Sequence, residues 1–207
     1  GHTTDGSVWG GDPAQYPYLE GSLLQAGGGV LNLSTNADFD AFIKNREYPS
    51  YDGTFPMYRW ETTVTNRQLE EEVTEVGTIL NITVTERGVG GIVKKIRLEG
   101  SDGVATISGE GQVRASLGNK YMIITKSDGT LMKNFESLPS AYISIENQGV
   151  NDSNVTTFHI YGGGFGHGVG MSQNGAQEMA REGMSYEDIL KFFYHGVEVK
   201  EAESSKE

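Results

Sequence analysis

Apolar and polar residues alternate over much of the middle of this chain. The alternation runs through 78–85 and 91–98, and a Ser-Asp-Gly sequence at 101–103 leads into a third apolar run at 104–107. A period of two predicts β-strands with one buried face, and Ser, Asp and Gly together predict a turn. We therefore expect a hairpin or a three-stranded meander in this part of the chain.

Three further segments have the composition of strands. Residues 59–65, 142–145 and 155–160 consist mainly of β-branched and aromatic residues. Residues 1–34 contain many Gly and two Pro, which predicts loops and short strands. The overall pattern favours turns, strands and a few helices over a helical bundle.

Helical spacing appears in three short segments before the last third of the chain. Asn36 is a good N-cap for a helix through Ile43. A second helix is predicted after Thr65 or Asn66, because Leu69, Val73 and Val76 follow at helical spacing. A third is predicted over 111–117.

The C-terminal part predicts two consecutive helices. Ser172 can cap the first, and Gly183 stands where a helix end favours a residue that tolerates positive φ. The sequence Ser185-Tyr186-Glu187-Asp188 has a capping-box pattern before apolar residues at i, i+3, i+4 and i+7. The expected fold class is α+β, made of Gly-rich mixed strands and short helices and ending in an αα-hairpin behind a glycine-rich loop.

Length and composition indicate one globular unit. The chain has 207 residues, of which 36% are hydrophobic and 21% charged. These values fit a single domain over 1–200, with an inserted lobe around 60–150 and an acidic tail at 201–207 that we expect to fray. No stretch approaches the roughly 20 apolar residues that cross a bilayer, so no membrane segment is expected in this chain.

Charge and cysteine content exclude several functions. The formal net charge is -12, from 28 acidic and 16 basic residues, which argues against nucleic acid as a partner. The chain has no Cys, so disulfides, Cys-ligated zinc and thiol nucleophiles are excluded. No His or acidic spacing indicates a metal site, and we expect no metal and no cofactor.

The most informative segment runs from Tyr161 to Gln173. Six of the nine residues 162–170 are Gly, and the loop also carries His167 and ends in Ser172-Gln173. Glycine at this density lets a ligand approach the main chain closely, at a folding cost of roughly 0.5 to 1 kcal/mol per residue relative to Ala. Hydrogen-bonding groups presented without bulky neighbours suit a sugar.

Other interpretations of this loop remain. The segment has no phosphate-binding motif and no Lys, so nucleotide binding is a weak interpretation. His167 can equally be a structural histidine. A triad of Ser172, His167 and an acid lacks the Gly-x-Ser-x-Gly elbow, and the pair of carboxylates that most glycosidases use cannot be located. The residues alone thus predict a glycine-framed polar cleft.

The same segment resembles the SpoIID/LytB family of bacterial cell-wall proteins. The resemblance rests on Gly166-His167-Gly168-Val169-Gly170-Met171-Ser172-Gln173, followed by Gly175-Ala176, Gly183, Tyr186 and Ile189-Leu190. Weaker similarities, such as Gly1-His2-Thr3 and Val8-Trp9-Gly10-Gly11, extend it over nearly the whole chain. Phe165 stands where the family often has Trp. The Glu-bearing helix that precedes the Gly-His-Thr segment in the family has no counterpart here.

The resemblance implies a lytic transglycosylase that cleaves the MurNAc-GlcNAc bond of peptidoglycan and leaves a 1,6-anhydro product. The catalytic Glu, and a signal or anchor for an extracytoplasmic location, are then expected upstream of Gly1. The implied partners are peptidoglycan glycan strands and other sporulation or cell-wall hydrolase proteins. The alternatives are a non-catalytic peptidoglycan-binding or autolysin-modifying protein and a structural component of a sporulation assembly. The implied substrate-binding residues are His167, Ser172, Gln173, Gly166, Gly168, Phe165, Tyr18 and Thr3.

Overall fold

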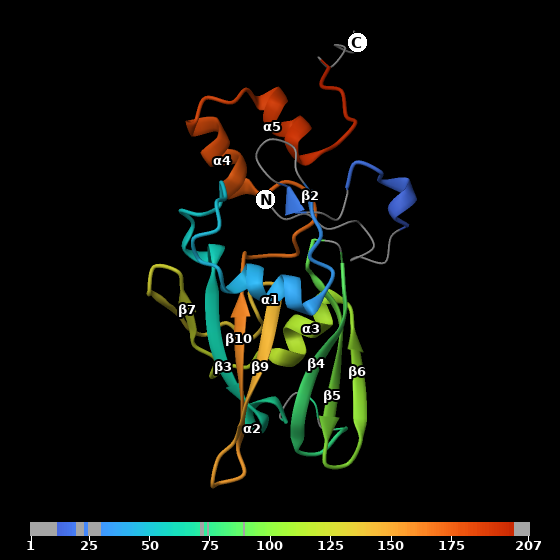
Figure 1. Ribbon diagram of the computed structural model, residues 1–207, viewed down its shortest axis with the longest axis vertical. Helices are drawn as coiled ribbons and strands as arrows, with labels where there is room; N and C mark the ends of the chain where they lie inside the picture. Colours follow the sequence, from blue (N-terminus) through green and yellow to red (C-terminus); the bar gives the residue numbers. More distant parts are fainter. Residues whose placement is uncertain are drawn as a thin grey trace, which may run out of the picture.

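The computed structural model describes residues 12–19, 23–24, 30–70, 73, 75–88 and 90–200. Over these residues it is an α+β fold of antiparallel sheets and short helices, as the sequence predicts (Figure 1). The domain boundaries at 1–200 and around 60–150 stay predictions. The acidic tail at 201–207 lies outside the described residues.

A five-stranded antiparallel sheet forms the centre of the fold. Its strand order is β8-β7-β3-β10-β9. The strands are β3 (Trp60–Thr65), β7 (Ile124–Lys126), β8 (Leu131–Met132), β9 (Ile143–Val150) and β10 (Thr156–Gly162). Alternate residues of β3 and β10 are buried, among them Val64, Phe158 and Ile160, which are fully enclosed. One face of the sheet therefore faces the core, and the other carries polar side chains.

A three-stranded meander packs beside this sheet, with strand order β4-β5-β6. The strands are β4 (Ile79–Arg87), β5 (Val93–Gly100) and β6 (Val104–Ser108). This confirms the three strands expected from the alternation. Buried residues of both sheets belong to one hydrophobic cluster. Helix α3 (Glu110–Leu117) follows the meander and buries Val113 and Leu117 in the same core.

Helix α1 (Asn36–Lys44) lies across one end of the strands (Figure 1). Thr35, one residue earlier than expected, is its N-cap and accepts a hydrogen bond from the Asp38 backbone N–H. The helix buries Phe39, Phe42 and Ile43 in the core.

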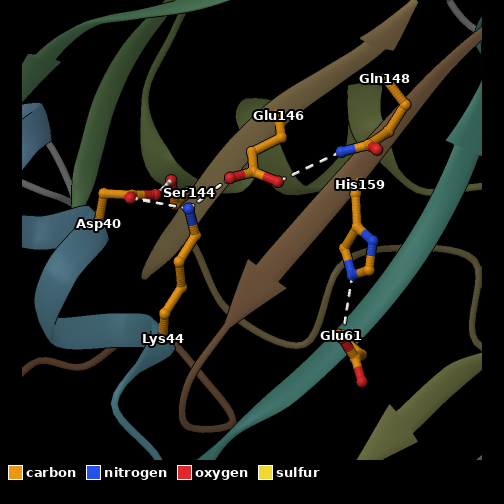
Figure 2. Close-up of polar contacts among 7 residues, drawn as sticks. All are labelled: Asp40, Lys44, Glu61, Ser144, Glu146, Gln148 and His159. Atoms are coloured by element: carbon orange, nitrogen blue, oxygen red, sulfur yellow. Dashed lines mark hydrogen bonds and ion pairs between the residues drawn. The ribbon is translucent and has the colours of Figure 1, made fainter.

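Polar contacts tie α1 to β9 on the exposed side of the helix (Figure 2). Lys44 lies 2.7 Å from Asp40 and also pairs with Glu146, and the Ser144 hydroxyl donates to Asp40 at 2.6 Å. Burial alone would raise the pKa of the Asp40 carboxyl. Hydrogen bonds from Lys44 and Ser144, with the nearby positive charge, hold that pKa below its usual value.

Helix α2 (Asn66–Leu69) is shorter than expected. Thr65 is its N-cap, one of the two residues expected, and forms a capping box with Gln68, but the helix ends at Leu69. The prediction that Val73 and Val76 continue it is wrong. Val73 lies outside the helix, and Val76 lies in a turn and packs against Gly100 of β5.

The chain ends in the predicted αα-hairpin, α4 (Gln173–Arg181) and α5 (Tyr186–Phe193), at the opposite end of the molecule from α2 (Figure 1). Ser172 and Ser185 are the N-caps, as expected. Met179, Ile189 and Phe193 form a small core of their own between the two helices. The remaining short elements are the 3-10 turns η2 (Pro13–Gln15) and η3 (Pro56–Tyr58) and the strand pair β1 (Leu23–Leu24) and β2 (Val30–Leu31).

Candidate functional site

The glycine-rich loop leaves the end of β10 and leads into α4. Its first half is fixed by backbone hydrogen bonds on both sides. The Gly163 N–H donates to the Tyr142 carbonyl, the Gly164 N–H to Met57, and the Gly166 N–H to Pro139. The Trp60 indole Nε1–H donates to the Gly164 carbonyl at 3.0 Å, and the Ser140 hydroxyl donates to the Gly163 carbonyl at 2.7 Å. The base of the loop is thus held in one conformation.

Alternate glycines in this loop have positive φ, at residues 164, 166, 168 and 170. Gly168 shows why the sequence needs glycine. Its φ is 74°, and a Cβ placed there would lie 2.6 Å from the Tyr142 ring. The buried Tyr142 ring therefore packs directly against the loop backbone, and any side chain at 168 would displace one of them.

A cleft of about 410 Å³ opens along this loop. This volume falls in the range of roughly 300–1,000 Å³ that is typical of ligand sites. Its walls come from the loop after β10, from the segment that precedes β3, and from the segment that precedes β9. The lining residues are Asp52, Phe55, Tyr58, Arg59, Ser140, Tyr142 and 163–174.

His167 is exposed at the tip of the loop and lines the cleft. Its Nδ1 accepts a hydrogen bond from the Val169 backbone N–H at 2.9 Å. In a neutral imidazole the proton then resides on Nε2, so this atom is a donor. The loop backbone thereby selects the His167 tautomer.

Ser172 connects the cleft to helix α4. Its Oγ accepts the Gly175 N–H at 3.1 Å as the helix N-cap, and the hydroxyl donates to Asp52 Oδ1 at 2.5 Å. Asp52 lies 120 residues away in sequence, in the turn that precedes η3. The start of a helix favours a negative charge nearby. Asp52 therefore fixes both the end of the loop and the first turn of α4.

Arg59 is the cation among the described lining residues, and it is committed to the fold. It is 2% exposed and donates to the Tyr58 and Phe42 carbonyls at 3.0 and 3.3 Å. Its guanidinium lies over the Tyr58 and Phe42 rings. Burial lowers the pKa of the guanidinium below its usual value, although Tyr58 and Asp52 oppose this effect. Because Phe42 is in the last turn of α1, Arg59 stabilises that helix end beneath the cleft.

Comparisons with known proteins show the family of this chain. A family model described as "Domain of unknown function (DUF8618)" matches residues 5–123. Stage II sporulation protein D of Bacillus subtilis (strain 168) is 35% identical over 115 residues, and that of Bacillus amyloliquefaciens is 55% identical over 51 residues. The chain is a SpoIID/LytB-like member of the DUF8618 family. A protein of B. subtilis named Amidase enhancer is 42% identical over 57 residues.

These similarities cover parts of each protein. The similarity to stage II sporulation protein D of B. subtilis covers 53% of this SpoIID/LytB-like chain and 30% of that protein. For the B. amyloliquefaciens protein the two shares are 25% and 15%, and for the protein named Amidase enhancer they are 28% and 7%. The matched segment thus spans less than a third of the length of each curated relative.

Among the described residues, no helix is long and apolar enough to cross a membrane. The described part of the chain also has no cluster of three His, Cys, Asp or Glu suited to a metal ion.

The structure brings most of the predicted substrate-binding residues of this SpoIID/LytB-like chain to one place. His167, Ser172, Gln173, Gly166, Gly168 and Phe165 all line the cleft. Phe165 is 54% exposed, and its ring is tilted against that of Phe135. Tyr18 is not a lining residue. It packs edge-on against Tyr194, the residue after α5, whose hydroxyl accepts the Met171 N–H, so Tyr18 is connected to the site through Tyr194. Thr3 lies outside the described residues.

Residues of the cleft that the sequence did not indicate include Asp52, Ser140 and Tyr142. Each comes from an irregular segment or from the residue before a strand, and each meets the loop only in the folded chain. The Ser-Tyr-Asp-Gly sequence at 50–53 is an ordinary turn composition. No local signal separates Asp52 from the other acidic residues of the chain.

Proposed function

We propose that this chain binds the glycan strands of bacterial peptidoglycan in the cleft and forms the substrate-holding part of a lytic transglycosylase with a cell-wall role in sporulation. The observation that supports this most strongly is the glycine loop itself. It presents the Nε2 donor of His167 and the exposed amide of Gln173 along a cleft of about 410 Å³ with the Phe165 ring beside them. Polar groups beside an exposed aromatic ring are suited to a sugar, which has hydroxyls and an apolar ring face.

The proposed reaction needs one carboxyl group. It protonates the glycosidic oxygen as the bond from C1 to that oxygen breaks, and its carboxylate then takes the proton of the C6 hydroxyl as that oxygen bonds to C1. The products are a 1,6-anhydro sugar and a strand end with a free hydroxyl. The carboxyl group is regenerated, and no water is consumed.

Asp52 is poorly suited to this task. Among the described lining residues it is the one carboxylate, but its Oδ1 already accepts the Ser172 hydroxyl and it lies at the start of α4. Both contacts commit this carboxylate to holding the loop and the start of the helix in place. We therefore assign Asp52 a positioning role. The catalytic carboxyl is proposed to be a Glu supplied from outside the described residues, as the family resemblance implies.

Purified peptidoglycan tests this proposal. The 207-residue chain should sediment with insoluble peptidoglycan and release no anhydro-muropeptides, as measured by mass spectrometry. A longer chain that carries a Glu-bearing helix before Gly1 should release them, and a Glu→Gln change in that helix should abolish release. Anhydro product from the 207-residue chain, or no binding by either chain, would contradict the proposal.

A second candidate function is favoured by the similarity to the protein named Amidase enhancer. In this case the cleft would hold glycan while a separate hydrolase acts. Retention on peptidoglycan without anhydro product from the longer chain would select this function. The proposed location is extracytoplasmic in both cases, because the substrate is there.

A further inference from the structure

A second groove lies on the outer face of the five-stranded sheet, away from the core. It encloses about 400 Å³ between β3 and the segment that leads into β7. Its lining residues are Glu61, Thr62, Thr63, Tyr121, Ile123, Thr125 and His159. None of them lines the glycine-loop cleft.

The register of the sheet explains how these side chains meet. Thr63 of β3 is directly opposite His159 of β10, and Glu61 is directly opposite Thr125 of β7. Directly opposed residues share one face of a sheet. Figure 2 shows Glu61 and His159 pointing toward each other from neighbouring strands, with His159 Nε2 and Glu61 Oε2 3.0 Å apart.

The one carboxylate among the described lining residues of this groove, Glu61, is already paired within the protein. Besides its contact with His159, Glu61 pairs with Arg46 at 2.8 Å. Both oxygens of the Glu61 carboxylate are therefore engaged, one by each partner. A cationic ligand would have to displace one of these partners, so the groove is better suited to an uncharged ligand.

Aromatic surface and hydroxyl groups complete the groove. Tyr121 is 57% exposed and Ile123 45% exposed, so apolar surface is open to solvent here. The His159 ring stacks on Tyr161 with centroids 4.3 Å apart, which holds the imidazole edge toward the groove. Thr63 and Thr125 supply hydroxyls from neighbouring strands. Hydroxyls, an imidazole and an exposed aromatic ring suit the polar edges and apolar face of a sugar ring.

We propose that this outer groove is a second glycan site, which binds an uncharged N-acetylhexosamine unit. The identity of the sugar rests on the proposed function of the cleft. Both sites lie along the same strands, because Arg59 and Gly163 line the cleft while Glu61 and His159 line the groove. Four residues from His159 to Gly163 correspond to about 13 Å along a strand. A glycan polymer could therefore contact the protein at two places.

The test is a titration of the ¹⁵N-labelled 207-residue chain with a β-linked N-acetylglucosamine tetramer, followed by NMR. We expect chemical-shift changes at the backbone amides of Thr63, Tyr121 and Ile123 in addition to those of the glycine loop. Tyr121→Ala should weaken the affinity measured at the groove by roughly three- to tenfold, the value of one aromatic contact. The affinity measured at the loop should not change.

Val104→Ala is the matched control, because Val104 is a similarly exposed apolar residue on β6, at 54%. It should alter neither affinity. Shifts confined to the glycine loop would overturn the second site and leave the proposed function intact. Shifts confined to the groove would support the second site and contradict the proposed function. Groove shifts that Tyr121→Ala leaves unchanged would also overturn the inference.

Discussion

Replacing Ser172 by Ala should loosen the junction between the glycine loop and α4. The hydroxyl has two roles, as N-cap to the Gly175 N–H at 3.1 Å and as donor to Asp52 at 2.5 Å. Loss of an N-cap costs about 1 kcal/mol, and loss of a hydrogen bond to a charged group costs about 1.5 to 3 kcal/mol. Because Ser172 and Asp52 are both partly exposed, we expect the loss of unfolding free energy to lie near the lower end of the sum of these two costs, at about 2 to 3 kcal/mol.

Ser185→Ala provides a matched control in the same chain. Ser185 is the N-cap of α5 and accepts the Asp188 N–H at 3.1 Å, but its hydroxyl bonds only within its own exposed first turn. This variant should lose about 1 kcal/mol. The difference between the two variants isolates the contact that Ser172 makes with Asp52.

Urea unfolding monitored by circular dichroism measures both variants, and amide exchange at Gly175 and Asp188 reports the two caps locally. We expect Ser172→Ala to have the lower unfolding midpoint and faster exchange at Gly175. If Ser172→Ala were no more destabilising than Ser185→Ala, the anchoring role assigned to Asp52 would be refuted.

Two further predictions concern the loop and helix α1. Gly168→Ala should lower stability by more than Gly129→Ala in urea unfolding, because both have φ near 75° but only Gly168 faces a ring, that of Tyr142, at 2.6 Å. The positive φ alone costs about 1 to 2 kcal/mol in either variant. If Gly168→Ala and Gly129→Ala lost equal stability, the contact between residue 168 and Tyr142 would be unimportant. Asp40→Asn should lower stability at pH 7 but less at pH 3. The pKa of Asp40 is below its usual value in the fold, so its stabilisation is present above the unfolded pKa and lost as pH falls through the folded one. A deficit that is the same at both pH values would contradict this assignment.

Local signals in the sequence predicted much of this fold. The alternation over 78–107 placed the meander, and the two capping serines placed the helices of the hairpin within a residue. Asn36 and Thr35 are both good caps, and the fold selects Thr35 because the Asn36 side chain bonds Val84 and Arg87 instead. Tertiary contacts of this kind are not visible in a local pattern.

The candidate site was predicted only where its residues are contiguous. The loop from Gly162 to Gln173 carries its own signal, since six closely spaced glycines and a histidine are unusual. Asp52 and Tyr142 reach the loop across long sequence separations, and β7 and β8 are too short to show alternation. The outer groove needs β7 to lie beside β3, so it could not be predicted before the sheet order was known.

The central claim is that the glycine-framed cleft binds glycan through the donor that His167 presents. Isothermal titration of the wild-type chain and of His167→Ala with soluble peptidoglycan glycan chains tests it most directly. We predict measurable binding by the wild type, and for His167→Ala an affinity lower by about fivefold, the value of one hydrogen bond. Equal affinities for the two proteins, or no binding by the wild type, would contradict the claim.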